Sequence, residues 1–532
     1  MNALTGTGTL LRFVLRRDRI RLSVWTLALV GTVAATVPAL DEMFATEAQR
    51  RSRAALMDTP TGIVFGGPGY GLDDYGLGPM VVNELTMSLL IALAVMNILH
   101  VVRHTRAEEE SGRAELLRSG AVGPSAQMTA ALATAALVDL VIGGLVAATL
   151  AGSGLAIADS AAYGLGLALA GIAFGAVAAV CAQVTGYGRG AAGLAFLAVG
   201  VLFLFRVVGD MAEPGGNALS WLSPFAWVQQ TRVYDDLRWW PLLLYPLLVC
   251  LLFAAAYALA GRRDLGAGLV PPRPGPAGAG SLLRGATALH LHQQRGAVIA
   301  WAAAVFAFAA AFGTLSSEID TMLEENPELG AVFLGGTSEV MAGYLGTMVS
   351  YTMMAASAYA VVSVLRTRSE ESSGRAEAVL ATAVSRYRWF GGALVVSALS
   401  STLIVLLGGL GMGIGAAAAV EDSSWIGTML EAVLAQLPVA LLFTALTALV
   451  VGAAPRLVPL VWAWFGYSVL ATMFGGLLGL DEWLVDLSAF SMLPLLPGGE
   501  FEAAPVAVAA AVAVAAAAGG LLGFRRRDLL PV

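Results

Sequence analysis

Residues 105–115 read TRAEEESGRAE, and residues 367–377 read TRSEESSGRAE. Nine of these eleven positions carry the same residue at a constant offset of 262. Such agreement over a short charged stretch is more than shared composition produces. A segment that returns once, at a fixed distance, predicts a chain built from two homologous halves, each repeating the same order of elements.

Shorter sequence matches between the two halves occur in the same order along the chain. The run Arg263-Asp264-Leu265 returns as Arg527-Asp528-Leu529, so each half ends alike. Between the halves, residues 266–285 hold prolines at 271, 272, 274 and 276, which is typical of a linker. We therefore predict a first half over residues 1–265, a Pro/Gly-rich cytoplasmic linker over 266–285 and a second half over 286–532.

The composition points to a bilayer as the solvent of this chain. Of the 532 residues 58% are hydrophobic and 13% charged, and the mean hydropathy is +0.77, which exceeds what a soluble core can bury. Unbroken apolar runs of about 20 residues predict helices rather than a barrel. We expect an all-α integral membrane protein of about 12 transmembrane helices, arranged as two parallel six-helix repeats. The predicted spans lie near residues 20–40, 80–102, 126–152, 160–185, 190–211, 240–260, 297–316, 340–365, 389–415, 427–452, 457–480 and 503–524.

The basic residues predict the orientation. All 30 are arginines. If the N-terminus is cytoplasmic, 24 of the 30 fall in cytoplasmic segments, and the outer loops of the second half hold none. The exceptions in outer loops of the first half are Arg50, Arg51, Arg53, Arg232 and Arg238. The positive-inside rule thus predicts a multi-pass protein of the cytoplasmic (inner) membrane with both termini in the cytoplasm.

A short segment precedes the first span of each half. In the first half its apolar residues, Leu10, Leu11, Phe13, Val14 and Leu15, alternate with arginines at helical spacing. This pattern predicts an amphipathic helix in the inner headgroup layer. A plain cytoplasmic end of the first span is the alternative.

The duplicated block lies in the predicted cytoplasmic loop after the second span of each half. Its opposite charges at helical spacing, followed by Leu116 and Leu117, suit a short helix with one apolar edge. A single charged run of this kind would be a solvated, self-paired loop. Because the same residues recur in the same loop, we favour a docking element for a soluble partner.

With these features the chain resembles the permease subunits of bacterial ABC exporters of the ABC-2 type, in particular the fused twelve-span group described as exporters of polyketide antibiotics (tetronasin-type resistance). The resemblance covers nearly the whole chain. It implies an amphipathic elbow helix before each half, and a coupling helix in each duplicated loop that contacts the ATPase. The coupling residues would be Arg106, Glu108, Glu109, Arg113 and Glu115, with Arg368, Glu370, Glu371, Arg375 and Glu377.

The resemblance also implies partners. A phosphate-binding P-loop of the ordinary kind needs a lysine, and this sequence has none. ATP and Mg would therefore be bound by a separate ABC ATPase subunit, in two copies, and the permease would need no cofactor and catalyse no reaction itself. We expect a hydrophobic small-molecule cargo, a surrounding lipid bilayer and no nucleic acid.

Polar groups inside spans are costly and thus functional candidates. Besides Glu84 they are Asp139, Arg206 and Glu431. Aromatic and methionine side chains recur in the second and fifth spans of each half, for which packing or lipid contact is the simpler explanation. If these spans line a central path, its residues are Glu84, Met87, Phe203, Arg206, Tyr344, Tyr351, Trp464 and Tyr467. Such a lining suits a hydrophobic or amphipathic cargo, as in antibiotic or multidrug efflux.

Two other functions stay open. A proton-coupled secondary multidrug transporter would use Glu84 or Asp139 for its proton, but it would leave the duplicated block without a task. A membrane enzyme or sensor acting on lipids would need a convergent catalytic cluster, which the sequence does not suggest. His100 and His104 lie four residues apart, but without a cysteine or carboxylate cluster beside them we predict no metal site.

Overall fold

The computed structural model describes residues 2–271, 275, 277–280, 283–316, 340–475, 480–499 and 501–528. Over these ranges the chain forms helices joined by loops, without a strand. Eleven helices in this part are long and apolar enough to cross a membrane. The prediction of an all-α integral membrane protein is confirmed.

The chain divides into two compact units, Met1–Pro274 and Gly275–Val532. The boundary falls inside residues 266–285. Each unit has its own buried core, so we describe each half by itself.

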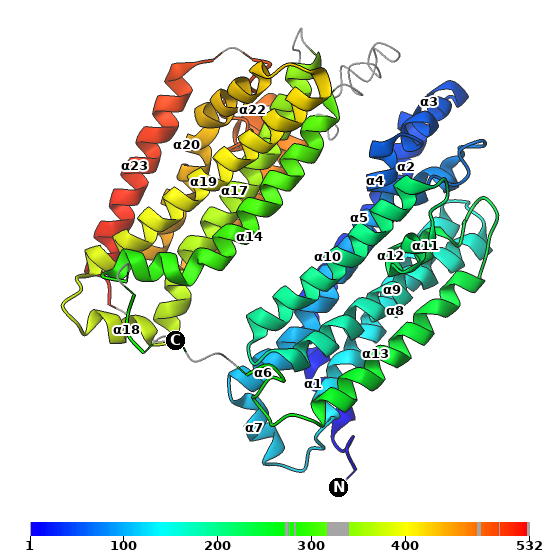
Figure 1. The fold of residues 1–532 in the computed structure, drawn as a ribbon, viewed down its shortest axis with the longest axis horizontal. Coiled ribbons are helices and arrows are strands. Elements are labelled where there is room, and N and C mark those ends of the chain that lie inside the picture. Colours follow the sequence, from blue (N-terminus) through cyan, green and yellow to red (C-terminus); the bar gives the residue numbers. More distant parts are fainter. Residues whose placement is uncertain are drawn as a thin grey trace. The chain divides into compact units, whose positions relative to one another are not determined.

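The first half is a bundle of long helices with short helices at both ends (Figure 1). Its long helices are α2 (Arg19–Met43), α5 (Leu77–His104), α8 (Ala126–Gly152), α9 (Ile157–Val184), α10 (Gly188–Ala212) and α13 (Leu244–Ala260). Its short elements are α1 (Thr7–Arg17), α3 (Glu47–Met57), α4 (Pro60–Gly66), α6 (Arg106–Glu110), α7 (Arg113–Arg118), α11 (Ala218–Trp221), α12 (Pro224–Gln229) and the 3-10 helix η1 (Trp240–Leu243).

The second half repeats this order with fewer short helices among its described residues. Its long helices are α14 (Ala286–Thr314), α17 (Val340–Ser372), α19 (Arg386–Val420), α20 (Ser424–Ala453), α21 (Val458–Phe474) and α23 (Ala503–Arg526). Its short elements are α18 (Arg375–Leu380), η2 (Pro455–Leu457) and α22 (Glu482–Asp486).

The neighbours of the helices also correspond. In the first half α9 packs on α8, α5 and α13, and in the second half α20 packs on α19, α17 and α23. A small capping bond recurs as well, because the Ser223 hydroxyl accepts from the Phe225 N–H at 3.3 Å and the Ser488 hydroxyl accepts from the Phe490 N–H at 3.2 Å. These two serines belong to one of the sequence matches between the halves, Leu222-Ser223 and Leu487-Ser488.

One predicted span is shorter than expected. The span placed at 457–480 corresponds to α21, which has 17 residues. At about 1.5 Å per residue such a helix covers about 26 Å, less than the roughly 30 Å of a hydrocarbon core. It is not among the eleven spans found in the described residues, whereas α13, also of 17 residues, is counted there together with η1.

The elbow prediction holds for one half only. In the first half α1 is a separate helix that ends at Asp18, whose backbone leaves the helical region at φ −100° and ψ 12°. In the second half α14 runs unbroken from Ala286, so its described residues contain no separate elbow helix. The corresponding part of α14 carries glutamines, Gln293 and Gln294, which favour a helix interior more than aspartate does.

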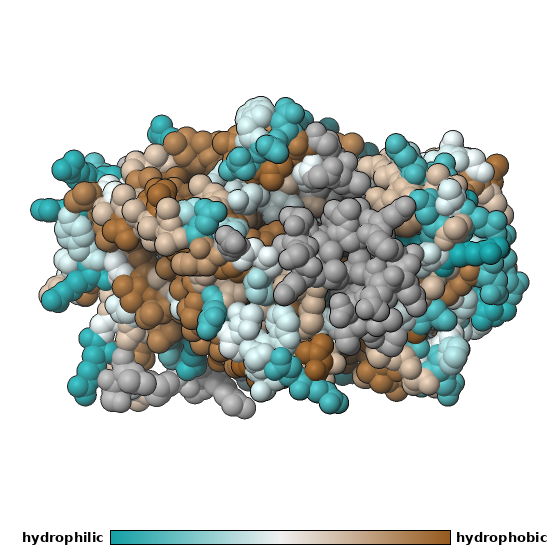
Figure 2. Space-filling view, turned by 90° about the horizontal axis from the view of Figure 1, so that it is seen from above, coloured by the Kyte–Doolittle hydropathy of each residue, from teal (hydrophilic) through white to brown (hydrophobic). Residues whose placement is uncertain are grey.

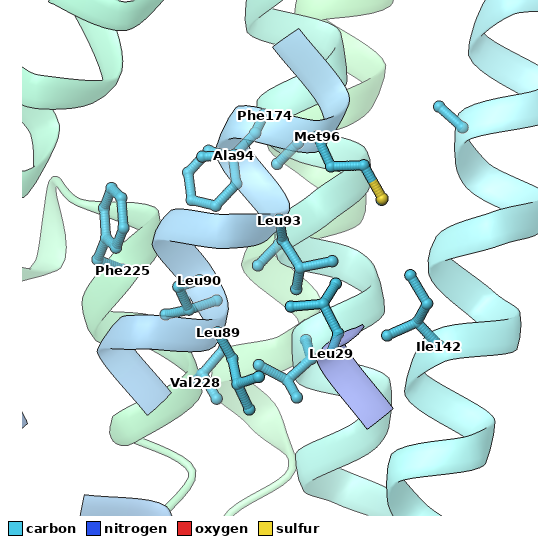
Figure 3. Packing of buried hydrophobic residues seen from close by; sticks show 14 of the residues in the cluster. Leu29, Leu89, Leu90, Leu93, Ala94, Met96, Ile142, Phe174, Phe225 and Val228 are labelled. Carbon is cyan, nitrogen blue, oxygen red and sulfur yellow. The ribbon is translucent and has the colours of Figure 1, made fainter. Parts of the chain in front are cut away.

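The core of the first half lies between α2, α5, α8, α9 and α12. Figure 3 shows part of this cluster, with Leu29, Leu89, Leu90, Leu93, Ala94, Met96, Ile142, Phe174, Phe225 and Val228 lying together. Small residues bring the helices close. A Cβ added at Gly143 of α8 would lie 2.2 Å from the Gly164 carbonyl of α9, so the two backbones touch, as in other small-residue membrane interfaces.

The outer faces of the helices are apolar. Figure 2 shows apolar side chains (brown) over much of the visible surface, interrupted by hydrophilic patches (teal). Large exposed residues include Leu27 at 72%, Leu243 at 71% and Leu399 at 66%. A soluble protein rarely leaves so much apolar surface in water, whereas lipid chains cover it in a membrane protein.

Candidate functional site

Both copies of the duplicated block lie at one end of their half, opposite α11 and α12 in the first half and opposite α22 in the second (Figure 1). We call this the block end of each half. The chain turns there through a left-handed glycine, Gly112 at φ +75° and Gly374 at φ +73°. Few residues other than glycine adopt this conformation, so the repeated glycine explains why α7 and α18 begin at the same position of the repeat.

An ion pair joins each block to the end of the last long helix of the same half. The Nη1 and Nη2 atoms of Arg263 each donate to one carboxylate oxygen of Glu109, both at 2.8 Å. In the second half Arg527 pairs with Glu371 in the same way, its Nη2 donating at 2.6 Å. The carboxylate side chains are 7% and 2% exposed. Two-pronged, buried pairs of this kind fix orientation as well as charge.

The first acid of each block pairs within the block. Glu370 accepts from Arg375 at 2.8 and 3.0 Å. Glu108 accepts from Arg113 at 2.6 Å and, in addition, from Arg17 at the end of α1, at 2.8 Å. The first block is therefore tied to α1 as well as to α13.

The first arginine of the block is buried to a different extent in the two halves. Arg106 is fully buried, and it donates to the carbonyl of Ala182 in α9 at 2.9 Å and to that of Ala267 at 3.1 Å. Arg368 is 30% exposed and lies 3.4 Å from Glu371. The same residue is thus an internal anchor in one half and a partly solvated group in the other.

The last acid of each block is exposed, as is the residue that follows it. Glu115 and Glu377 face solvent, and Leu116 is 76% exposed. The sequence suggested that all the acids of the block face a partner, but Glu109 and Glu371 are already paired inside their own half. The exposed acids at the end of each block therefore lie on α7 and α18.

At the opposite end of the first half, Glu84 forms an ion pair. Arg53 of α3 donates to both of its oxygens, at 2.6 and 2.7 Å. Two other arginines that depart from the positive-inside pattern are also paired, Arg50 with Asp41 and Arg51 with Glu47. Each of these arginines therefore has a carboxylate partner nearby in the sequence.

Arg206 in α10 contacts the same end of the first half, opposite the block end. It is buried, donates to the carbonyls of Val64 at 2.6 Å and Ile63 at 2.9 Å, and pairs with Asp210 at 2.8 Å. Its guanidinium also lies 5.7 Å from the ring of Phe203. Arg206 therefore satisfies the last turn of α4, where helix carbonyls lack partners.

The other proposed path residues lie within the packing of single halves. Met87 and Tyr344 are buried, and the Tyr344 hydroxyl donates to the Phe312 carbonyl at 3.0 Å. Tyr351 is half-buried. Trp464 and Tyr467 in α21 donate to the carbonyls of Leu487 and Leu484. The path was predicted from spans of both halves, and it stays a prediction.

Two acids placed inside spans have different surroundings. Asp139 of α8 is fully buried and accepts one hydrogen bond, from Asn97 of α5 at 3.0 Å, while its second oxygen has no hydrogen-bond partner. Glu431 in α20 is exposed.

The described geometry is that of a helical membrane protein with a matched charged block at one end of each half. The family model for the C-terminal domain of the multidrug efflux system permease Rv1217c matches residues 8–261 and 283–525. The multidrug efflux system permease protein Rv1217c of Mycobacterium tuberculosis is 35% identical over 531 residues, covering 99% of this chain and 95% of the relative. The chain belongs to this family of multidrug efflux permeases.

The two matched stretches of this permease fall one in each half; each contains the block of its half and ends two residues before the arginine that pairs with it. Sequence reasoning did not pair Glu109 with Arg263, or Glu371 with Arg527. The signal was present, since both the acid and the arginine recur in the two halves at nearly the same separation, 154 and 156 residues.

A second group missed from the permease's sequence is Asp18. It lies beside His104, 86 residues away, with its Oδ2 2.6 Å from the Nε2 of that histidine. The sequence shows no carboxylate beside His100 and His104, whereas the fold brings Asp18 to them. Within the described residues, Asp18, His100 and His104 form a group with metal-ligating atoms within 4.8 Å of one another.

Proposed function

We propose that the chain is the membrane-spanning permease subunit of an ATP-driven ABC exporter of the ABC-2 type, which moves hydrophobic or amphipathic compounds, tetronasin-type antibiotics among them. Two copies of a separate ATPase subunit would hydrolyse ATP with Mg. The observation that carries this proposal is the pair of blocks, each bound to the last long helix of its half by the same buried ion pair.

The contacts of the block can transmit a movement of the partner to the helices of the half. In the first half, Glu108 and Glu109 connect α6 and α7 to Arg17 of α1 and to Arg263 after α13. A partner that moves α7 would therefore move the first and last helices of the half together. Buried ion pairs with two-pronged geometry resist such separation, so the motion is transmitted rather than absorbed.

The partner must supply the nucleotide chemistry. Without a lysine the chain has no P-loop of the ordinary kind. ATP binding would close the ATPase pair, shift α7 and α18, and switch the cargo path from inward to outward access. The exposed Glu115, Leu116 and Glu377 supply charge and apolar area for that contact.

The proposal places the block end and both termini in the cytoplasm, in the inner membrane. Cysteines for labelling are best introduced at exposed positions, because a Cβ at Gly67 or Gly123 would clash with neighbouring atoms. In a background without Cys181 and Cys250, we expect Ser119→Cys and Ala383→Cys to react only from the cytoplasm. Asp73→Cys and Asp422→Cys should react only from outside. Labelling of all four from one side would contradict the orientation.

Transport in vesicles tests the energy source. Inside-out vesicles that hold the permease and its ATPase should accumulate a fluorescent amphipathic drug when ATP is present and the proton gradient is collapsed. The purified permease alone should hydrolyse no ATP. Accumulation that needs the gradient and ignores ATP would refute the exporter and support a proton-coupled secondary transporter.

Asp139 is the observation that favours this second candidate, since it is a buried acid with one unpartnered oxygen. Asp139→Asn keeps the shape and the bond to Asn97 within reach but removes the ionisable group. An ATP-driven exporter should keep its transport in this variant, whereas a proton-coupled transporter should lose it.

A further inference from the structure

The junction between α1 and α2 carries a buried polar group that the proposed export mechanism does not use. Asp18 lies at this junction, and His100 and His104 lie one turn apart on α5. All three side chains are buried, at 3 to 4% exposure. The imidazole rings of the two histidines lie 4.7 Å apart, and the Asp18 carboxylate contacts His104 at 2.6 Å.

His100 is the unusual member of this group. Neither of its ring nitrogens makes a hydrogen bond, although both are buried. Buried polar atoms without partners are rare and call for an explanation. The ring borders a cavity of about 410 Å³ that is also lined by Arg21, Leu22, Trp25, Met96 and Arg103.

We propose that Asp18, His100 and His104 bind a Zn²⁺ ion. Two imidazole nitrogens and one carboxylate oxygen are a common donor set for this metal, with a water in the fourth position. The ligating atoms already lie within 4.8 Å of one another, so small side-chain movements bring them to the roughly 2.0–2.2 Å bond lengths that zinc needs. The cavity beside His100 gives room for the water.

The Asp18 carboxylate is held from two sides. Its Oδ2 contacts the Nε2 of His104. Its other oxygen lies 3.3 Å from Arg103, as outer partners commonly hold a ligating carboxylate.

The second half lacks this set of ligands. At the offset of 262, His100 and His104 correspond to Val362 and Arg366. There the first long helix reaches α17 through Gln294, which accepts from Ser363 at 2.6 Å. The three proposed ligands thus belong to the first half, and the corresponding place in the second half has a hydrogen bond between an amide and a hydroxyl.

A bound zinc would have a defined mechanical effect. His104 directly precedes the block, and Asp18 directly follows α1. The metal would fix the α1–α2 junction to the start of the block in the first half, next to the Arg17–Glu108 pair. This inference goes beyond the proposed export function and does not depend on the energy source of transport.

The test uses the purified full chain in detergent, freed of metal with a chelator, and then titrated with ZnSO4. We expect one Zn²⁺ per chain by elemental analysis, and affinity lowered at least about tenfold in His100→Ala and in Asp18→Asn. The control His292→Ala removes an exposed histidine of the second half and should bind as the unaltered chain does.

A second measurement guards against variants that fold poorly. Co²⁺ added to the unaltered chain should give visible absorption bands of a four-coordinate nitrogen and oxygen site, displaced by one equivalent of Zn²⁺. Zn²⁺ should also raise the unfolding temperature of the unaltered chain and not that of His100→Ala. Absence of the cobalt bands, or equal zinc binding by all variants, would overturn the proposal.

Discussion

The two halves carry nearly the same block but hold it differently. In the first half α5 ends at His104, and the block is tied by Glu108 to α1 and by Arg106 to α9. In the second half α17 continues unbroken to Ser372, and Arg368 is partly solvated. The common element is the Glu–Arg pair to the last helix. The comparison shows that duplication preserved one contact while the surrounding contacts diverged, and four changes would test this difference.

The largest effect is expected from reversing the shared acid. Glu109→Arg would place a third guanidinium beside Arg106 and Arg263 in a buried site. Because breaking a buried pair leaves uncompensated charge, we expect a loss of about 3–5 kcal/mol in stability. Thermal unfolding in detergent measures it. Glu371→Arg should act similarly in the second half, since Arg527 and Arg368 lie beside it.

The double variant Glu109→Arg with Arg263→Glu restores opposite charges and should recover part of this loss. Exposed Glu115→Arg is the control and should leave the unfolding temperature unchanged. If Glu109→Arg proved as harmless as Glu115→Arg, the buried pair would have no structural role.

The long helices could be predicted from the sequence because apolar runs are local signals. The predicted span 126–152 coincides with α8, and the span 503–524 lies within α23. The separate α1 was also predicted from local amphipathic spacing. The described residues of the second half contain no separate elbow helix, and this could not be foreseen, because the break at Asp18 in the first half depends on contacts with His104 and Arg103, both from another helix.

The repeated sequence points to the block, but it does not distinguish the buried acids from the exposed ones. Glu109 and Glu115 look alike in a charged helical pattern, and the contact with Arg263, which follows α13, distinguishes the buried acid from the exposed one. A partner 154 residues away is not indicated by helical periodicity, and only the recurrence of both residues in the second half points to it. The role of the block as a docking element stays a prediction.

The second test compares substitutions of the first arginine of each block, Arg106 and Arg368. Arg106→Ala removes a buried group that satisfies the carbonyls of Ala182 and Ala267, so we expect a loss of about 3 kcal/mol. Arg368→Ala removes a partly exposed ion pair and should cost less than about 1 kcal/mol. Unfolding of both variants under the same conditions measures the ratio. Equal losses of stability in the two variants would mean that the different burial of Arg106 and Arg368 does not affect the free energy of unfolding.

The third change concerns the ends opposite the blocks, where the first half has arginines and the outer loops of the second have none. We expect Glu84→Ala and Arg53→Ala to lower stability equally, by about 1–2 kcal/mol, because each leaves the other member unpaired. Drug-efflux profiles add a second readout. If Glu84→Ala changed the range of exported drugs and Arg53→Ala did not, the result would support the prediction that Glu84 lies on the substrate path.

The smallest effect on stability is expected on the exposed faces of the two short helices. Leu116 on α7 is 76% exposed, and its counterpart on α18 is Ala378, also exposed. Neither side chain packs in its own half, so Leu116→Asp and Ala378→Asp should each change stability by less than about 0.5 kcal/mol. Their effect on transport should differ, because Leu116 offers more apolar area to a partner than Ala378 does. We expect Leu116→Asp to reduce drug-stimulated ATPase activity of the complex more than Ala378→Asp, with the double variant lowest. Equal, unimpaired activity in all three would mean that the partner binds elsewhere, and the proposal that α7 and α18 are the coupling elements would fail while the fold stood unchanged.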